Sequence, residues 1–166
     1  GFPIAFAKSQ MAAGTMLPTE GRVFVSVRDS DKANMVEPVR LLQEMGFEVI
    51  TTGGTNRYLA EKGIQTRLLK KISEGRPNCI DMINNMELSL ILNTPNRKGL
   101  HTDEGRLRSM AVRFNVPMIT TTTGAAAAVQ AIKALRAGKW GVRALQDYFG
   151  HLADATPTEQ TVTNRA

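Results

Sequence analysis

Apolar positions along this chain alternate between short continuous runs and runs with helical spacing. Short apolar, β-branched runs predict buried strands, over residues 22–27, 47–51, 65–69, 87–93 and 116–120. Helical spacing between them predicts helices, over residues 35–46, 56–62, 78–85, 103–114 and 124–135. Strands that alternate with helices through short connections predict an α/β, three-layer sandwich around a five-stranded, mainly parallel sheet.

Glycines mark the predicted helix ends. Gly46, Gly63 and Gly138 each follow the last apolar position of a helical run, where glycine commonly ends a helix. Pro38 lies near the start of the first of these helices, where proline is tolerated only if the first turn starts late.

The segment Thr51-Thr52-Gly53-Gly54-Thr55 joins a predicted strand to a predicted helix. A strand, a tight glycine turn and a helix aim backbone N–H groups and a positive helix end at one point. Two glycines let the backbone approach a ligand closely, and two threonines add hydroxyl donors. The segment therefore predicts a site for a phosphate or a carboxylate, although glycines also occur in such turns for steric reasons alone.

In parallel sheets, ligands bind at the carboxyl ends of the strands, near the change in strand order. This rule selects the loops that follow the predicted strands, over residues 28–32, 51–55, 70–76, 93–98 and 120–124. Most of these loops carry threonine, asparagine or lysine, which suit an anion. The opening prediction of an anion site is thereby strengthened.

Composition narrows the class of partner. The net charge of +6 favours an anionic ligand, but the basic residues are dispersed and aromatics make up 5% of the chain. Dispersed charge and few aromatics do not favour a nucleic-acid-binding surface. The sequence also has no apolar run long enough for a membrane-spanning helix. Cys79 is the single cysteine, which fits a reducing, cytoplasmic compartment. The histidines lack metal-ligand spacing, so no metal site is predicted.

Three motifs resemble a known family. Ser26-Val27-Arg28-Asp29-Ser30-Asp31-Lys32, Thr52-Gly53-Gly54-Thr55 and Lys71-Ile72-Ser73-Glu74-Gly75-Arg76-Pro77 are similar to the methylglyoxal-synthase-like domain. They most closely resemble the C-terminal allosteric domain of the carbamoyl-phosphate synthase large chain, over about residues 4–150. The fold that the resemblance implies is methylglyoxal-synthase-like, of the Rossmann or flavodoxin kind.

The resemblance also implies domain boundaries. Residues 1–21 resemble a helix and linker from the preceding ATP-grasp unit, and residues 22–150 the regulatory domain. The polar, threonine-rich composition of residues 151–166 predicts a disordered tail. The chain begins at Gly1 without a methionine, which fits a piece of a longer protein.

The function that the resemblance implies is regulatory. Relatives bind a nucleoside monophosphate such as UMP or IMP, and ornithine acts at the border with the neighbouring domain. Matching positions assign the effector phosphate to Lys32, Thr52, Gly53, Gly54, Thr55 and Lys71, and the nucleoside to Asn93, Pro95 and Lys98. The ornithine border falls at Thr120 and Thr121. Two positions depart from the family pattern: Pro95 replaces a usual threonine and Ile119 a usual acid.

The wider assembly is also implied by the resemblance. The full-length enzyme is an ATP-dependent, glutamine-hydrolysing ligase that uses Mg or Mn and serves pyrimidine and arginine biosynthesis. Its partners are the rest of the large chain, the glutaminase small chain and further copies through self-association. No catalytic residue and no cofactor are predicted within these residues, which are expected to be non-catalytic alone.

Other interpretations remain open at this stage. Urea-cycle relatives bind N-acetylglutamate in this pocket, but they differ at the position of Lys71, which favours a nucleotide. A stand-alone methylglyoxal-synthase-like lyase needs a carboxylate base, and Thr94-Pro95-Asn96-Arg97-Lys98 supplies no acid and no histidine. A role without a ligand also remains open for three of the assigned residues. Lys32 and Lys71 can also be explained as solvent-exposed lysines, and Asn93 as a turn residue.

Overall fold

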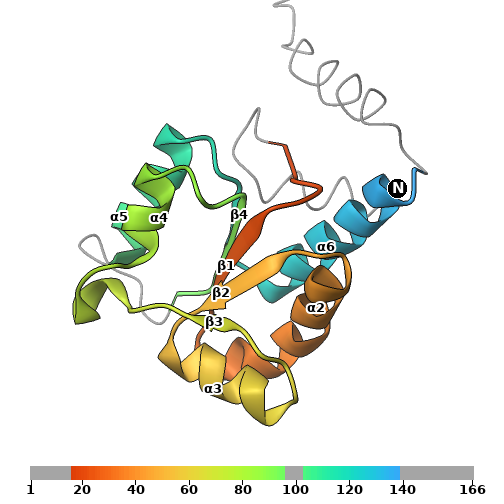
Figure 1. Cartoon of the computed structure of the whole chain (residues 1–166), viewed down its shortest axis with the longest axis horizontal. Helices are drawn as coiled ribbons and strands as arrows, with labels where there is room; N and C mark the ends of the chain where they lie inside the picture. Colours follow the sequence, from red (N-terminus) through yellow and green to blue (C-terminus); the bar gives the residue numbers. More distant parts are fainter. Residues whose placement is uncertain (1–15, 96–102, 139–166) are drawn as a thin grey trace, which may run out of the picture.

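The computed structural model describes residues 16–95 and 103–138, which form a five-stranded sheet (Figure 1). The strands are β1 (Arg22–Ser26), β2 (Glu48–Thr51), β3 (Arg67–Leu68), β4 (Leu90–Asn93) and β5 (Met118–Ile119). Their order is β3-β2-β1-β4-β5, and every pair is parallel. The predicted three-layer α/β architecture with a parallel sheet is confirmed. The helix expected within the first 15 residues and the tail expected over residues 151–166 lie outside the described residues.

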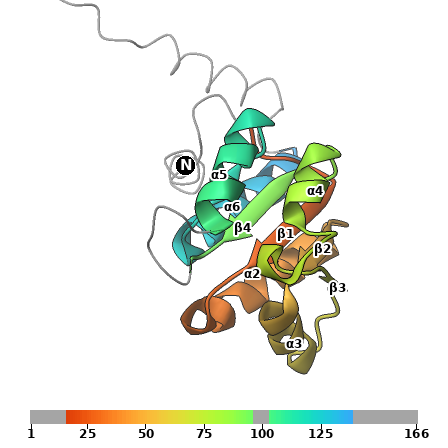
Figure 2. The ribbon, with the colours of Figure 1, turned by 90° about the vertical axis from the view of Figure 1, so that its left-hand side faces the viewer.

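Helices cover both faces of the sheet. They are α2 (Lys32–Glu44), α3 (Gly53–Glu61), α4 (Cys79–Asn84), α5 (Asp103–Arg113) and α6 (Thr122–Arg136), with short 3-10 turns η1 (Asp29–Asp31) and η2 (Ile72–Glu74). In Figure 1, α4 and α5 lie to the left of the strands and α2 and α6 to the right. Figure 2 views the molecule from the α4 and α5 side, with α6 behind the strands.

The strands feed two apolar clusters because successive side chains point to opposite faces. Val23, Val25 and Leu92 pack with α2, α3 and α6 on one face. Phe24 and Ile91 pack with α4 and α5 on the other. The central strands are buried on both faces, which explains why their sequences read as continuous apolar runs rather than alternating ones.

The strand order reverses between β1 and β4, its neighbour on the other side. The chain moves outward from β1 to β2 and β3, then returns across the sheet to β4. The parallel register sets Ser26 beside Asn93 at the carboxyl ends of these two strands. Such a switch point leaves a crevice above the strand ends, because the helices on either side of it leave in opposite directions.

Helix α2 contradicts the expectation that its first turn starts late. It begins at Lys32, so Pro38 lies inside it. Proline removes the N–H that would bond the carbonyl of Asn34, but Asn34 is exposed, and water can satisfy that carbonyl. Pro38 is itself buried beside Val39 on the apolar face of the helix, and this packing offsets the lost bond.

Helix α3 also begins earlier than predicted, at Gly53 rather than Asn56. The glycine pair is therefore the first turn of the helix and not a turn ahead of it. Neither glycine has a positive φ, unlike Gly46, Gly63 and Gly138, which end their helices as expected. What Gly53 and Gly54 contribute is the absence of a side chain over the helix end.

The segment ahead of β1 packs against the domain. Leu17 is buried in the same apolar cluster as α6, and the guanidinium of Arg136 donates a hydrogen bond to the carbonyl of Thr19 at 2.5 Å. Residues 16–21 thus run along the last turn of α6 before the sheet begins.

Candidate functional site

A cavity of about 380 Å³ lies over the carboxyl ends of β1, β2 and β4, at the switch in strand order. Its floor is polar: the Ser26 and Thr52 hydroxyls are 2.9 Å apart, and Asn93 stands beside Ser26. The loop after β3 and the first turns of α4 and α5 form its walls. The lining residues are Phe24, Ser26, Val27, Thr52, Lys70, Lys71, Ile72, Ser73, Cys79, Asn93, Thr94, Pro95, Asp103, Glu104 and Leu107.

Four of the residues assigned to the effector from the sequence line this cavity: Thr52, Lys71, Asn93 and Pro95. Lys32, Gly53, Gly54 and Thr55 lie next to it, around the start of α3. Lys98 falls outside the described residues. The sequence-based assignment to an effector stays a prediction, but the fold brings most of these residues to one edge of the sheet.

The amino end of α3 is left without a side-chain cap. Thr52 occupies the N-cap position in an extended conformation, but its hydroxyl is engaged with Ser26 and makes no cap hydrogen bond. The first N–H groups of a helix have no partner within the helix. The amides of Gly53 and Gly54 therefore remain available to an anion, and the helix dipole favours one there.

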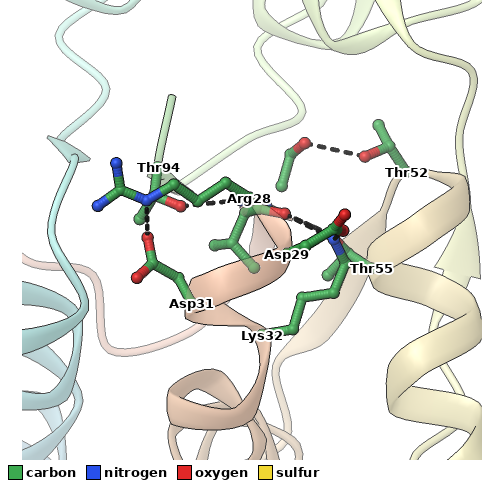
Figure 3. Close-up of polar contacts among 9 residues, drawn as sticks. Arg28, Asp29, Asp31, Lys32, Thr52, Thr55 and Thr94 are labelled. Atoms are coloured by element: carbon green, nitrogen blue, oxygen red, sulfur yellow. Dashed lines mark hydrogen bonds and ion pairs between the residues drawn. The ribbon is translucent and has the colours of Figure 1, made fainter. Parts of the chain in front are cut away.

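Lys32 brings a buried ammonium to the same point. The residue is 8% exposed, and its Nζ donates to the carbonyl of Val27 at 3.1 Å and pairs with the carboxylate of Asp29 (Figure 3). A methyl group added to Gly54 would lie 3.6 Å from this Nζ. The ammonium is thus close to the positive end of α3 and at the first residue of α2, where a cation is unfavourable unless an anion is near.

Thr55 supports the loop after β1. It is buried in the first turn of α3, and its hydroxyl accepts a hydrogen bond from the N–H of Val27 at 3.3 Å. The same hydroxyl lies 3.5 Å from the carbonyl of Val27, to which it donates. Since that carbonyl also receives Lys32, Thr55 fixes the backbone that positions the lysine.

The two lysines after β3 differ. Lys70 donates to the carbonyl of Arg76 at 3.1 Å, whereas the exposed Lys71, at the start of η2, has no hydrogen bond or ion pair from its ammonium to the described residues. The charge of Lys71 nevertheless reaches Asp29. The hydrogen bond and charge of Lys32, with the charge of Lys71, hold the pKa of the Asp29 carboxyl below its usual value.

Asn93 presents an unused amide to the cavity. The residue is 9% exposed and ends β4, and its side chain makes no hydrogen bond within residues 16–95 and 103–138. No buried side-chain nitrogen or oxygen of the described residues lacks a hydrogen-bond partner, so the amide of Asn93 is not a buried orphan but opens to the cavity, where a ligand can bond to it. Its neighbour Thr94 is committed, because its hydroxyl accepts from the N–H of Arg28 at 3.0 Å.

Thr120 and Thr121, the residues of the expected ornithine border, do not line the cavity. They follow β5, one strand beyond β4. Thr121 is the N-cap of α6, and its hydroxyl accepts from the N–H of Gly124 at 3.0 Å. The fold places them at the same edge of the sheet as the cavity but outside it.

Three acidic residues at the site were not predicted. Asp29 pairs with Lys32, and Asp103 and Glu104 line the cavity from the first turn of α5. Asp29 stands three residues before Lys32, a spacing that signals a local ion pair. The other two carry a weaker signal, as acids at a predicted helix start, where they are common for dipole reasons.

Cys79 forms part of the cavity wall at the start of α4. Burial raises the pKa of its thiol to about 12, with a further contribution from the charge of Asp103. A helix start usually lowers a thiol pKa, so burial dominates here. Cys79 is a buried residue of the apolar cluster that α4 and α5 form with the sheet.

Within residues 16–95 and 103–138, no three His, Cys, Asp or Glu side chains gather closely enough to hold a metal ion. None of the helices in these residues has the length and apolar character required to cross a bilayer.

Comparison with known proteins finds one family model, the MGS-like domain, which matches residues 34–120. A carbamoyl phosphate synthase large chain from Rhizobium meliloti is 47% identical over 148 residues, which are 89% of this chain and 13% of the relative. The C-terminal section of such a large chain from Methanopyrus kandleri is 43% identical over 95% of this chain and 29% of the relative. The chain therefore spans a small part of the curated relatives it matches.

Among solved structures, a methylglyoxal synthase from Elizabethkingia anophelis matches with a TM-score of 0.52 and 18% identity. The match covers 68% of this chain and 79% of the other. At this identity the likeness concerns the fold.

Proposed function

The chain belongs to the family of MGS-like domains, and from that premise we propose that it is the allosteric regulatory domain of a carbamoyl phosphate synthase large chain. In this proposal it binds a nucleoside monophosphate of the UMP or IMP type and catalyses no reaction by itself. The similarity to large chains from several organisms supports the choice of enzyme.

One observation supports a phosphate-containing ligand. The buried ammonium of Lys32 stands beside the uncapped amino end of α3, so two positive features face one point. A phosphate dianion would accept from the glycine amides and from Lys32, and the free ammonium of Lys71 would contribute a second point charge. A single carboxylate has fewer oxygens and less charge for the same donors.

The cavity also has room for more than phosphate. Neighbouring strands are about 4.8 Å apart, so β2 and β4 lie roughly 10 Å from each other across β1. A ligand whose phosphate rests at α3 would reach with its nucleoside the amide of Asn93, which has no hydrogen-bond partner among the described residues. Inorganic phosphate is too small to span this separation, which is why we propose a nucleotide rather than an anion alone.

The whole enzyme would make carbamoyl phosphate from bicarbonate, an ammonia donor and ATP, with Mg or Mn, for pyrimidine and arginine biosynthesis in the cytoplasm. This domain would act on the distant catalytic units through a coupling free energy, typically about 1–3 kcal/mol. Its partners would be the rest of the large chain, the glutaminase small chain and other copies of the large chain.

The direct test is calorimetric titration of the 166-residue chain with UMP, IMP and inorganic phosphate. We expect Lys32→Met and Lys71→Met each to weaken nucleotide binding by about tenfold or more, as expected for losing a charge-assisted hydrogen bond. Lys62→Met removes the same charge from the far end of α3, where Lys62 stacks on Tyr58. Lys62→Met should bind the nucleotide like the parent. An equal loss of nucleotide affinity in all three variants would show that only the net charge of the protein matters.

A thermal-shift panel separates the candidate ligands. It would compare UMP, IMP, ornithine, N-acetylglutamate and phosphate, since a ligand that binds the native state stabilises it by an amount that grows with the logarithm of its concentration relative to its Kd. Ornithine should still raise the Tm of Lys71→Met if it acts at Thr120 and Thr121, which lie outside the cavity. A shift with N-acetylglutamate but not with UMP would replace the nucleotide by an acyl amino acid.

A second candidate function rests on Asp103 and Glu104. The lyase alternative was disfavoured because residues 94–98 carry no acid, yet these two carboxylates line the cavity from α5. They offer a base for proton abstraction next to a phosphate site. Methylglyoxal formation from dihydroxyacetone phosphate that is lost in Asp103→Asn would establish this activity, and its absence in the parent would leave the receptor function.

A further inference from the structure

The ion pair between Asp29 and Lys32 joins two side chains in very different surroundings. The Lys32 side chain is 10% exposed, whereas the Asp29 side chain is 99% exposed. Asp29 belongs to η1, a turn in which no residue is buried. The lysine is fixed by its contacts, and the aspartate approaches it from solvent (Figure 3).

Asp29 occupies the ammonium that the proposed function assigns to a phosphate. Its carboxylate contacts the ammonium of Lys32, which lies next to Gly54, and it is also within reach of the charge of Lys71. Among the described residues, Asp29 is the anion paired with Lys32. An incoming phosphate would meet a carboxylate already in contact with one of its principal donors.

We propose that Asp29 is an internal competitor of the effector, occupying the Lys32 ammonium in the free protein and leaving it when a phosphate binds. This inference rests on the proposed anion site at Lys32 and the start of α3. It adds a residue that sets the affinity of that site, and it gives Asp29 a role opposite in sign to that of a ligand-binding residue.

The surroundings of Asp29 permit this exchange. The Asp29 carboxylate has Lys32 as its one hydrogen-bond partner in the described part of the chain, so it can turn into solvent without breaking other bonds. Lys32 keeps its bond to the carbonyl of Val27 throughout. Asp31 in the same turn is different, because its side chain is 13% exposed and accepts from Nε of Arg28 at 2.6 Å.

Competition of this kind lowers every anion affinity by one common factor. If the closed pair is favoured over the open form by a constant K, each apparent Kd is the intrinsic Kd multiplied by 1 + K. The factor belongs to the protein and is the same for phosphate and for UMP. Asp29 would therefore set the effector concentration at which the site fills without changing which effector is preferred.

The test compares Asp29→Asn with the parent in calorimetric titrations with inorganic phosphate and with UMP. Removing the competitor and its negative charge should tighten both ligands by about three- to tenfold, the range expected for a solvent-exposed ion pair together with a nearby like charge. The fold-change should be equal for the two ligands. Asp29→Glu, which retains a carboxylate, should bind like the parent.

Asp31→Asn is the matched control. It removes the same charge two residues away, from a carboxylate that Arg28 holds, and it should change either Kd by less than about twofold because Arg28 already neutralises that carboxylate. An equal tightening in Asp31→Asn and Asp29→Asn would assign the effect to net charge and overturn the proposal. Weaker binding in Asp29→Asn would also overturn it, because Asp29 would then be positioning Lys32 for the ligand.

The outcomes separate this proposal from the proposed function. If the parent binds neither ligand and Asp29→Asn binds phosphate, the competitor exists but the effector role fails. If neither protein binds, both fail. Carboxyl carbon NMR adds a second readout: saturating phosphate should return the depressed pKa of Asp29 towards its ordinary value, and an unchanged pKa with bound phosphate would show that Asp29 never leaves Lys32.

Discussion

Helices α3 and α6 have the same type of N-cap residue, but only α6 has a side-chain cap at its amino end. Each follows a strand at the carboxyl edge of the sheet, and each has a threonine in an extended conformation at its N-cap. Thr121 accepts a hydrogen bond from the third amide of α6, at Gly124. Thr52 makes no such bond, and its hydroxyl points instead to Ser26 across the crevice floor.

The difference lies in the neighbouring strand rather than in the capping residue. Ser26 ends β1 next to β2, and its hydroxyl holds that of Thr52 at the crevice floor instead of over the helix end. Helix α3 therefore begins without a side-chain cap beside Lys32, while one amide of α6 is satisfied by Thr121. An N-cap threonine in sequence therefore does not say whether a helix end is available to a ligand.

The largest expected effect concerns the start of α4, which is capped like that of α6 and extends the comparison to a third helix. Asn78 caps α4 by accepting from the N–H of Ile80, and Cys79 at its first position has a pKa of about 12. We expect iodoacetamide to modify Cys79 in the native protein at pH 8 about a thousandfold more slowly than in urea, because thiolate is the reactive form. Similar rates would contradict a buried, neutral thiol at this helix start.

The next largest effect is expected when an aspartate is introduced at the second position of α3 and, in a separate variant, of α6. Gly54→Asp would set a carboxylate beside Lys32 and the open amides, where the added Cβ has room. We expect nucleotide affinity to fall about a hundredfold, as for an occluded charge-assisted site, with a higher Tm from helix-dipole pairing. Thr123→Asp at the matching position of α6 should raise the Tm and leave nucleotide titrations unchanged. Equal effects on affinity would break the distinction between the two helices.

A smaller pair of changes removes the two threonine hydroxyls. Thr121→Ala should lower the free energy of unfolding by about 1 kcal/mol, the usual cost of a lost N-cap, with unchanged UMP affinity. Thr52→Val should weaken UMP binding about tenfold, as it removes a hydroxyl from the crevice floor. Urea unfolding and calorimetry on both variants measure this contrast. A loss of affinity in Thr121→Ala alone would reverse the assignment.

The smallest effect comes from the opposite edge of the sheet, where charges are paired with one another. Glu48 at the start of β2 pairs with Arg22 and Arg67, which lower the pKa of its carboxyl. A depressed pKa stabilises the fold above the unfolded value near 4.5, and this stabilisation is lost as pH falls through the folded pKa.

Discounted for solvent exposure, this contribution is about 0.5 kcal/mol. Urea unfolding of the parent between pH 5 and pH 3 should therefore show a loss of stability that is smaller by this amount in Glu48→Gln. An identical pH profile in the two proteins would show that these surface pairs contribute nothing measurable.

Hydrophobic patterning was sufficient for the fold, because every strand and helix expected within the described residues is present. Patterning was less successful with element boundaries. The helix beginning at Lys32 was expected later because Pro38 suggested a late start, and the packing of Pro38 is a tertiary effect. The helix at Gly53 was also expected later, since local propensity places glycine outside helices.

Site residues that directly follow a strand could be predicted from the sequence. Side-chain pairings between elements distant in the sequence could not. Thr52, Lys71 and Asn93 follow from the rule that parallel strands end at one edge. The pairing of Thr52 with Ser26 depends on register between strands distant in sequence, which no local pattern contains. Asp29 was not predicted as a site residue. Its spacing from Lys32 is compatible with an ion pair, but the burial of Lys32, which makes that pair informative, depends on the fold.

The hydrogen bond from Arg136 to Thr19 gives α6 two attachment points. Its first residues follow β5 at the crevice edge, and its last turn holds the backbone that leads into β1. Fifteen helical residues span about 22 Å. The helix is thus a rigid strut between the edge of the sheet and the segment through which the chain arrives, and tilting one end would move the other without any flexible loop in between.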